Sequence, residues 1–151
     1  MRNSLITLLV AALGTLAVPA SPAWAVAGDE AASEAATGYG DAKAMVDAGN
    51  YAAALHALNT LTRDEARNAD AWNLLGFTHR KLGHLDDSAT AYLTALALDP
   101  DHLGALEYQG ELFLATGQPD LARANLTRLQ GLCGTCEEAE DLSQAIQAAG
   151  V

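Results

Sequence analysis

The stretch DAWNLLGFTHRKLGHLDDSATAYLTALALDP, residues 70–100, contains two helical patterns on either side of a turn signal. In each segment, the residues of one face recur every three or four positions, as on an amphipathic helix. They are Trp72, Leu75, Gly76 and His79 in the first segment, and Ala89, Tyr92, Ala95 and Leu96 in the second. Gly83 separates the segments, and Pro100 follows the second. The stretch therefore predicts two antiparallel helices joined by a tight turn.

The second half of this stretch recurs along the chain at a fixed interval. GNYAAALHALNTL begins at Gly49, GHLDDSATAYLTAL at Gly83 and GQPDLARANLTRL at Gly117, each 34 residues after the one before. The first half also aligns with residues 104–117 and, more weakly, with residues 35–49. One helix pair cannot bury its apolar face alone, whereas stacked pairs bury a continuous core. The interval therefore predicts three stacked helix pairs, at about 35–68, 69–102 and 103–132.

In period and residue order, this pattern resembles the tetratricopeptide repeat. The middle unit carries most of the resemblance, through Trp72, Leu75-Gly76, Gly83, Tyr92, Ala95 and Pro100. The third unit keeps Gly110, Phe113, Gly117 and Ala122. In the first unit, Ala42 replaces the packing glycine and Met45 replaces the usual aromatic residue. The resemblance covers roughly residues 35–132 and implies an all-α, right-handed helical-repeat solenoid whose three antiparallel helix pairs occupy 38–132.

The C-terminal segment, residues 133–151, predicts one further helix that caps the stack. It opens with Thr135 and Glu138 at the spacing of a capping box. Its apolar positions then form a single stripe of Ala139, Leu142, Ile146 and Ala149. Because the end of a repeat stack needs a polar outer face, we expect this amphipathic helix to seal the third pair.

The N-terminal segment MRNSLITLLVAALGTLAVPASPAWA, residues 1–25, is typical of a cleaved secretory signal. A basic start precedes an apolar run and the small-residue site Ala23-Trp24-Ala25. The run is shorter than the roughly 20 residues that a membrane-spanning helix needs, so we expect a mature chain without a membrane span. Residues 26–37, VAGDEAASEAAT, predict a flexible acidic and alanine-rich tether. The expected location is the bacterial periplasm, or outside the cell.

The resemblance also implies a concave, peptide-binding face lined by the first helix of each pair. The expected partner-binding residues avoid the packing face of that helix and correspond between units through the 34-residue shift. They are Tyr39, Lys43, Asn73, Phe77, Arg80, Glu107 and Glu111. Aromatic and arginine residues often anchor interfaces, which singles out Phe77. The alternative is that Phe77 packs against the neighbouring unit.

Composition and motifs favour a binding protein over an enzyme. The formal net charge is −11, which disfavours binding to nucleic acid or to an anionic membrane surface. The sequence contains no G-x-S-x-G, G-x-x-x-x-G-K or H-E-x-x-H motif. We therefore expect a non-catalytic scaffold or adaptor for a protein or peptide, without a cofactor. Two alternatives remain: an assembly factor for client proteins with a redox-active cysteine pair, and a self-associating structural module.

The two cysteines, Cys133 and Cys136, form a C-x-x-C pair just before the capping helix. In an oxidising compartment a local disulfide that pins the turn is the simplest interpretation. A redox-active pair is the alternative, although no βαβ pattern surrounds it. A zinc site is disfavoured because the histidines lack a matching ligand spacing, and His79 is expected to be a buried packing residue.

Overall fold

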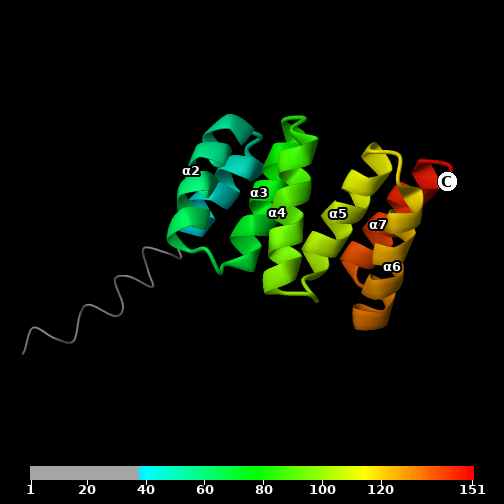
Figure 1. The fold of residues 1–151 in the computed structure, drawn as a ribbon. Coiled ribbons are helices and arrows are strands. Elements are labelled where there is room, and N and C mark those ends of the chain that lie inside the picture. The colour runs from blue at the N-terminus through cyan, green and yellow to red at the C-terminus, as the bar shows by residue number, and fades with distance from the viewer. Residues whose placement is uncertain (1–37) are drawn as a thin grey trace, which may run out of the picture.

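The computed structural model describes residues 38–151, and all of its regular secondary structure is helical (Figure 1). The predicted signal segment and tether lie outside the described residues. A first helix covers residues 38–47. The helices that follow are α2 (Tyr51–Asp64), α3 (Ala69–Lys81), α4 (Leu85–Leu98), α5 (Leu103–Ala115), α6 (Pro119–Cys133) and α7 (Glu137–Ala148). The predicted all-α architecture, three helix pairs with a C-terminal helix, is confirmed.

The 34-residue glycine period has a backbone explanation. Gly49, Gly83 and Gly117 have φ angles of 73°, 81° and 74°, in the left-handed region that glycine adopts without steric cost. Each lies in the turn between the two helices of a pair. The same backbone requirement therefore recurs once per repeat, which accounts for the interval seen in the sequence.

Within the second pair, a glycine allows α3 and α4 to approach closely. A Cβ atom on Gly76 would lie 2.6 Å from the ring of Tyr92, which is fully buried. The buried hydroxyl of Ser88 donates a hydrogen bond of 2.8 Å to the Gly76 carbonyl oxygen. Small residues at positions 76 and 88 thus permit the contact, and Tyr92 fills the space between the helices.

The third pair uses its packing glycine differently. Repeat equivalence would place Leu126 against Gly110, as Tyr92 lies against Gly76. Instead, a Cβ atom on Gly110 would lie 2.6 Å from the methyl groups of Leu142 in α7. The C-terminal helix therefore packs directly into α5, as well as against α6.

Helix α7 buries Ala139, Leu142 and Ile146, as its sequence pattern predicted. Two details of that prediction are wrong. Cys136 rather than Thr135 is the N-cap residue, and its side chain makes no capping hydrogen bond within the described part of the chain. Ala149 follows the helix and is exposed, because the helix ends at Ala148.

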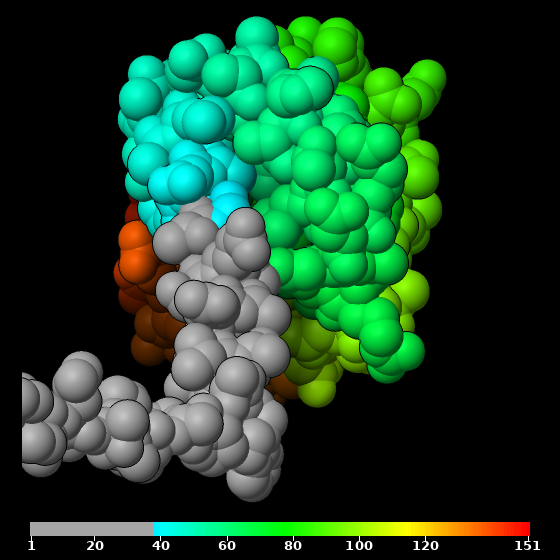
Figure 2. All heavy atoms as spheres, turned by 90° about the vertical axis from the view of Figure 1, so that its left-hand side faces the viewer, coloured from blue at the N-terminus to red at the C-terminus, as the bar shows by residue number. Residues whose placement is uncertain are grey.

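Most of the buried apolar residues fall into two clusters, and Tyr92, Ala95, Ala105 and Leu112 are buried outside them. The first joins helix 38–47, α2 and α3, together with Ala91 of α4. The second joins α5, α6 and α7. Figure 2 looks at the end of the molecule formed by the first repeat, where residues 38–50, in cyan, lie beside the green residues that follow them. Among residues 38–151, no helix is long and apolar enough to span a bilayer.

Candidate functional site

Helices α3 and α5, the first helices of the second and third pairs, meet through three side-chain contacts. The amide nitrogen of Asn73 lies 3.2 Å from the position that a Cβ of Gly104 would take. Phe77 contacts Tyr108, and Arg80 forms an ion pair with Glu111. In all three contacts the partner lies 31 residues further along the chain. We call this row of contacts the seam.

Phe77 lies between aromatic rings from two neighbouring helices. Its ring centroid is 6.4 Å from that of Tyr51 in α2 and 5.0 Å from that of Tyr108 in α5. Such tilted, edge-to-face pairs are favourable beyond the area that they bury. All three rings are only half-buried. Phe77 therefore does pack against the neighbouring unit, while part of the aromatic cluster remains open to solvent.

Arg80 forms the ion pair at one end of the seam, next to Phe77. Its side chain is 16% exposed, and that of its ion-pair partner Glu111 is 28% exposed. The guanidinium carbon lies 5.5 Å from the centroid of the Phe77 ring and 5.8 Å from that of Tyr108, within the range of cation–π attraction. The arginine is thus held by one carboxylate and two aromatic rings.

Glu107, predicted as a charged groove residue, is buried and only 7% exposed. The pKa of its carboxyl is raised to about 8. Burial is the main cause, the neighbouring carboxylates of Glu111, Asp141 and Glu138 add to it, and Arg80 opposes it. At pH 7 this carboxyl is therefore mainly protonated. The predicted groove therefore carries less negative charge at Glu107 and Glu111 than the sequence suggests, because Glu111 is paired with Arg80 and Glu107 is neutral.

Two buried polar atoms at the seam have no hydrogen-bond partner among residues 38–151: Asn73 Oδ1 and Arg80 Nε. Buried polar groups in folded proteins are nearly always hydrogen-bonded, so each exception needs an explanation. Both atoms belong to α3, beside the half-buried rings of Phe77 and Tyr108. A third such atom, the Tyr92 hydroxyl, lies near Arg80. All three are buried in this structure, so a ligand reaches Asn73 Oδ1 or Arg80 Nε only when the side chain that carries it rotates toward solvent.

The two predicted residues of the first unit have other surroundings. Lys43 pairs with Asp47 of its own helix at 2.7 Å, and both side chains are more than half exposed. This hydrogen bond raises the pKa of the Lys43 ammonium. Tyr39 is half-buried against the first apolar cluster, and burial, followed by the charge of Asp70, raises its pKa. Neither residue takes part in the contacts that define the seam.

Tyr51 and Tyr108, which complete the aromatic cluster, are not among the residues predicted from the sequence. A 34-residue shift finds equivalent positions in successive repeats, but the residues in contact across the seam differ by 31. Applying that second shift to Phe77 would have identified Tyr108, and applying it to Arg80 identifies Glu111. The 31-residue spacing is visible in the sequence, but only the packing of α3 against α5 shows that residues at this spacing are in contact.

Cys133 and Cys136 are joined by a disulfide, with their Cα atoms 5.6 Å apart. Cys133 is the last residue of α6 and Cys136 is the N-cap residue of α7. Gly134 between them has a φ of 70°, which lets the chain reverse within this short loop. The bond therefore fixes the turn that brings α7 back onto α5 and α6.

Reduction of this disulfide is expected to lower the free energy of unfolding by about 2 kcal/mol, since the loop that it closes is short. Urea unfolding followed by circular dichroism, with and without reductant, measures the difference. A variant with serine at both positions is the control and should not respond to reductant. Equal stability of the oxidised and reduced chains would show that the disulfide does not stabilise the turn.

Comparisons with known proteins agree with this fold. Two family profiles described as tetratricopeptide repeat match the chain, one over residues 39–76 and the other over residues 69–102. No curated protein sequence matches the chain. The helix pairs and their packing thus define an all-α helical-repeat protein. The matches cover residues 39–102, and over those residues they confirm the resemblance to the tetratricopeptide repeat seen in the sequence.

Solved structures share the arrangement at low sequence identity. The Yersinia enterocolitica type III secretion translocator chaperone SycD is 19% identical, with a TM-score of 0.68 over 76% of this chain and 81% of that one. SycD in complex with a peptide of the translocator YopD is 18% identical, with a TM-score of 0.67 over 83% of this chain and 92% of that one. The first such repeat domain of Spaghetti (RPAP3), bound to the HSP90 peptide SRMEEVD, is 17% identical, with a TM-score of 0.68 over 78% of this chain and 94% of that one. At these identities the likeness concerns the fold.

Proposed function

We propose that this chain is a non-catalytic scaffold that binds an extended segment of another protein at the seam. The observation that carries the proposal is the pair of unpartnered polar atoms, Asn73 Oδ1 and Arg80 Nε, beside half-buried aromatic rings. Once the Asn73 and Arg80 side chains rotate toward solvent, a peptide backbone can supply both missing partners, because its N–H can donate to Asn73 and its C=O can accept from Arg80. The peptide complexes of SycD and RPAP3 support a partner of this kind.

The chemistry of the seam limits the partner segment. Phe77 and Tyr108 offer aromatic surface to an apolar or aromatic side chain. The Lys81 ammonium lies 5.0 Å from the centroid of the Phe77 ring, whereas Glu138 and Asp141 contribute negative charge near Glu107. A lysine or arginine of the partner is therefore favoured on the side of Glu107. An acidic segment such as SRMEEVD is disfavoured by the same charges. The proposed ligand is therefore an extended, apolar and basic segment.

The scaffold is further proposed to act outside the cytoplasm, in a periplasm or after secretion. Two observations support this location. Residues 1–25 have the order of a secretory signal, and Cys133 and Cys136 form a disulfide, a bond that persists mainly in oxidising compartments. An adaptor or assembly role follows from binding a segment of another protein without changing it chemically.

The test combines capture with a binding measurement. A photoreactive amino acid at position 77 should give one dominant adduct in the native envelope, whereas the same group at position 93 should not. Leu93 is a suitable control because it lies on α4 and is 61% exposed. The captured segment, identified by mass spectrometry, is then synthesised with a fluorophore, and its affinity for the purified chain is measured by anisotropy.

The Asn73→Ala variant separates binding from folding. Because Asn73 Oδ1 has no partner within residues 38–151, the substitution should change the free energy of unfolding by less than about 1 kcal/mol. It should lower the affinity for the peptide at least about fivefold, since one hydrogen bond of the complex is lost. Leu93→Ala should leave the affinity unchanged. Unaltered affinity in Asn73→Ala would refute the seam as the site. Adducts only between copies of the chain would instead favour the self-associating module.

A further inference from the structure

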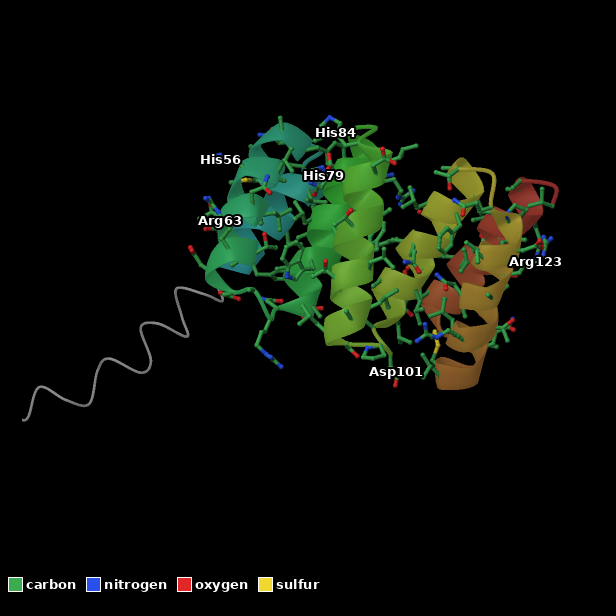
Figure 3. The ribbon with its side chains drawn as sticks, in the orientation of Figure 1. His56, Arg63, His79, His84, Asp101 and Arg123 are labelled. Atoms are coloured by element: carbon green, nitrogen blue, oxygen red, sulfur yellow. A yellow bond between two sulfur atoms is a disulfide. The ribbon has the colours of Figure 1, made fainter. Side chains whose placement is uncertain are left out.

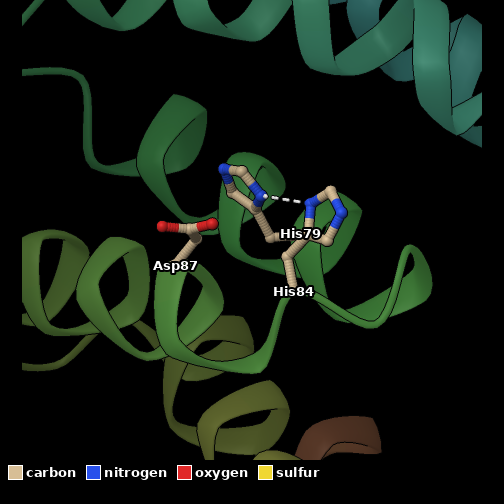
Figure 4. A group of neighbouring side chains, drawn as sticks. All are labelled: His79, His84 and Asp87. Carbon is tan, nitrogen blue, oxygen red and sulfur yellow. Dashed lines mark hydrogen bonds between the residues drawn. The ribbon is translucent and has the colours of Figure 1, made fainter.

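Three side chains at the turn of the second repeat bring metal-binding atoms together (Figure 4). His79 lies in the last turn of α3, His84 is the N-cap residue of α4, and Asp87 lies in the first turn of α4. One ligand atom from each falls within 4.8 Å of the other two. The two Nδ1 atoms of the imidazoles are 3.4 Å apart. His84 and Asp87 are exposed and His79 is half-buried, so the cluster is accessible from solvent.

The turn places the two imidazole rings beside each other, with their centroids 5.7 Å apart and their planes tilted by 49°. Gly83, with a φ of 81°, reverses the chain between α3 and α4, so residues five apart come into contact. Figure 3 shows His79 and His84 together at one end of this helix pair, with His56 separate on α2. The spacing of the histidines in the sequence disfavours a zinc site, because it matches no regular pattern of ligand pairs. The contact depends instead on a backbone reversal that such spacing does not describe.

His84 does not serve the helix end on which it lies. At three other helix starts, a side chain at the N-cap accepts a hydrogen bond from the backbone: Asn50, Asn68 and His102. The His84 side chain makes no such bond within residues 38–151, and its Nδ1 atom instead faces His79. Gln118 and Cys136, at two further helix starts, also make no such bond, so it is the contact with the second imidazole that distinguishes His84.

The other repeats show that the fold does not require these residues. The corresponding positions hold Met45, Asn50 and Ala53 in the first unit, and Phe113, Gln118 and Leu121 in the third. All three units nevertheless form the same turn with a glycine at positive φ. Packing and capping thus leave the His79, His84 and Asp87 set unexplained.

We propose that His79, His84 and Asp87 bind a divalent metal ion of the borderline class that includes Zn²⁺. Two imidazoles and one carboxylate suit Zn²⁺, Ni²⁺ or Cu²⁺, whereas Mg²⁺ and Ca²⁺ prefer ligand sets made entirely of oxygen. Zn²⁺ takes nitrogen and carboxylate oxygen ligands at about 2.0–2.2 Å, and in open sites a water molecule completes the tetrahedron. Rotation of exposed side chains is enough to converge atoms that already lie within 4.8 Å. The bound ion would join the end of α3 to the start of α4.

Isothermal titration of the full chain with Zn²⁺ tests this site. The sample for this titration is prepared without a polyhistidine tag. Its disulfide is kept oxidised so that no thiol competes for the ion. Mg²⁺ serves as the hard-ion comparison. His84→Asn is the decisive variant, because asparagine caps the equivalent helix at Asn50 and should preserve the fold. His79→Gln removes the second ligand, and His56→Gln is the control for an exposed histidine outside the cluster.

The expected result is one Zn²⁺ per chain and no binding of Mg²⁺. His84→Asn and His79→Gln should each lower the affinity at least about tenfold, since loss of even an outer-sphere partner typically costs 10–100-fold. His56→Gln should bind as the unaltered chain does. Excess Zn²⁺ should raise the melting temperature of the unaltered chain, but not that of His84→Asn. Absence of binding, or binding that persists unchanged in His84→Asn, would overturn the proposal.

Discussion

Replacement of Arg80 by leucine is expected to lower the free energy of unfolding by about 2–3 kcal/mol, between the cost of breaking an exposed ion pair and that of breaking a buried one, because its pair with Glu111 is only partly buried. The substitution leaves Glu111 without its cation, close to the buried carboxyl of Glu107. It also removes the guanidinium from the rings of Phe77 and Tyr108. Urea unfolding at pH 7, followed by circular dichroism, measures the loss.

Two further variants show whether the charge pair is responsible. Arg123→Leu breaks an exposed pair with Asp120 and should cost no more than about 1 kcal/mol. The double variant Arg80→Leu, Glu111→Leu should be more stable than the single Arg80→Leu variant, because no unpaired charge remains at the seam. If Arg80→Leu lost as little stability as Arg123→Leu, the pair of Arg80 with Glu111 would not stabilise the fold more than an exposed ion pair does.

Glu107 should make the protein less stable as the pH rises. In the unfolded chain its carboxyl titrates at the ordinary value of 4.5, whereas in the folded protein the pKa is about 8. Below pH 4.5 both states hold the proton, and the contribution of Glu107 to stability is fully present. Between these values only the folded state holds it, so raising the pH favours unfolding. Across that window the loss is on the order of 4 kcal/mol.

The Glu107→Gln variant isolates this effect from other titrating groups. Glutamine keeps the shape of the side chain but cannot ionise, so the variant should match the unaltered chain at pH 5 and exceed its stability at pH 9. Urea unfolding at both pH values provides the comparison. Glu140→Gln, at an exposed position of α7, should leave the pH dependence unchanged. A Glu107→Gln chain that loses as much stability as the unaltered chain between pH 5 and 9 would show that Glu107 is not the source.

The repeat architecture was predictable because each unit meets the same local requirements. Gly49, Gly83 and Gly117 occupy turns that need a positive φ, and such turns restrict the sequence strongly. The close approach of α3 and α4 likewise demands a glycine at position 76. These constraints act within one repeat, so a single sequence displays them at its period.

The seam was only partly predictable, because it depends on how successive repeats tilt against one another. The sequence identified Asn73, Phe77 and Arg80 as one stripe, but not their partners on α5. The burial of Glu107 could not be anticipated for a related reason. Its environment includes Glu138 and Asp141 of α7, whose position depends on the contact of Leu142 with Gly110. No second copy of that contact exists within the repeats to reveal it.

The two apolar clusters stabilise different parts of the protein, the first two helix pairs and the last three helices. In helical-repeat proteins each unit and each interface contributes its own term to stability. Here the first-helix contacts between the second and third units consist of an ion pair, two aromatic rings and an asparagine, while the apolar clusters lie on either side. Helix α4 also joins the clusters, because it packs on both α3 and α5 and its Leu96 packs against the second cluster. A ligand held by Asn73 and Arg80 would add contacts across the same interface and so strengthen the coupling between the two clusters.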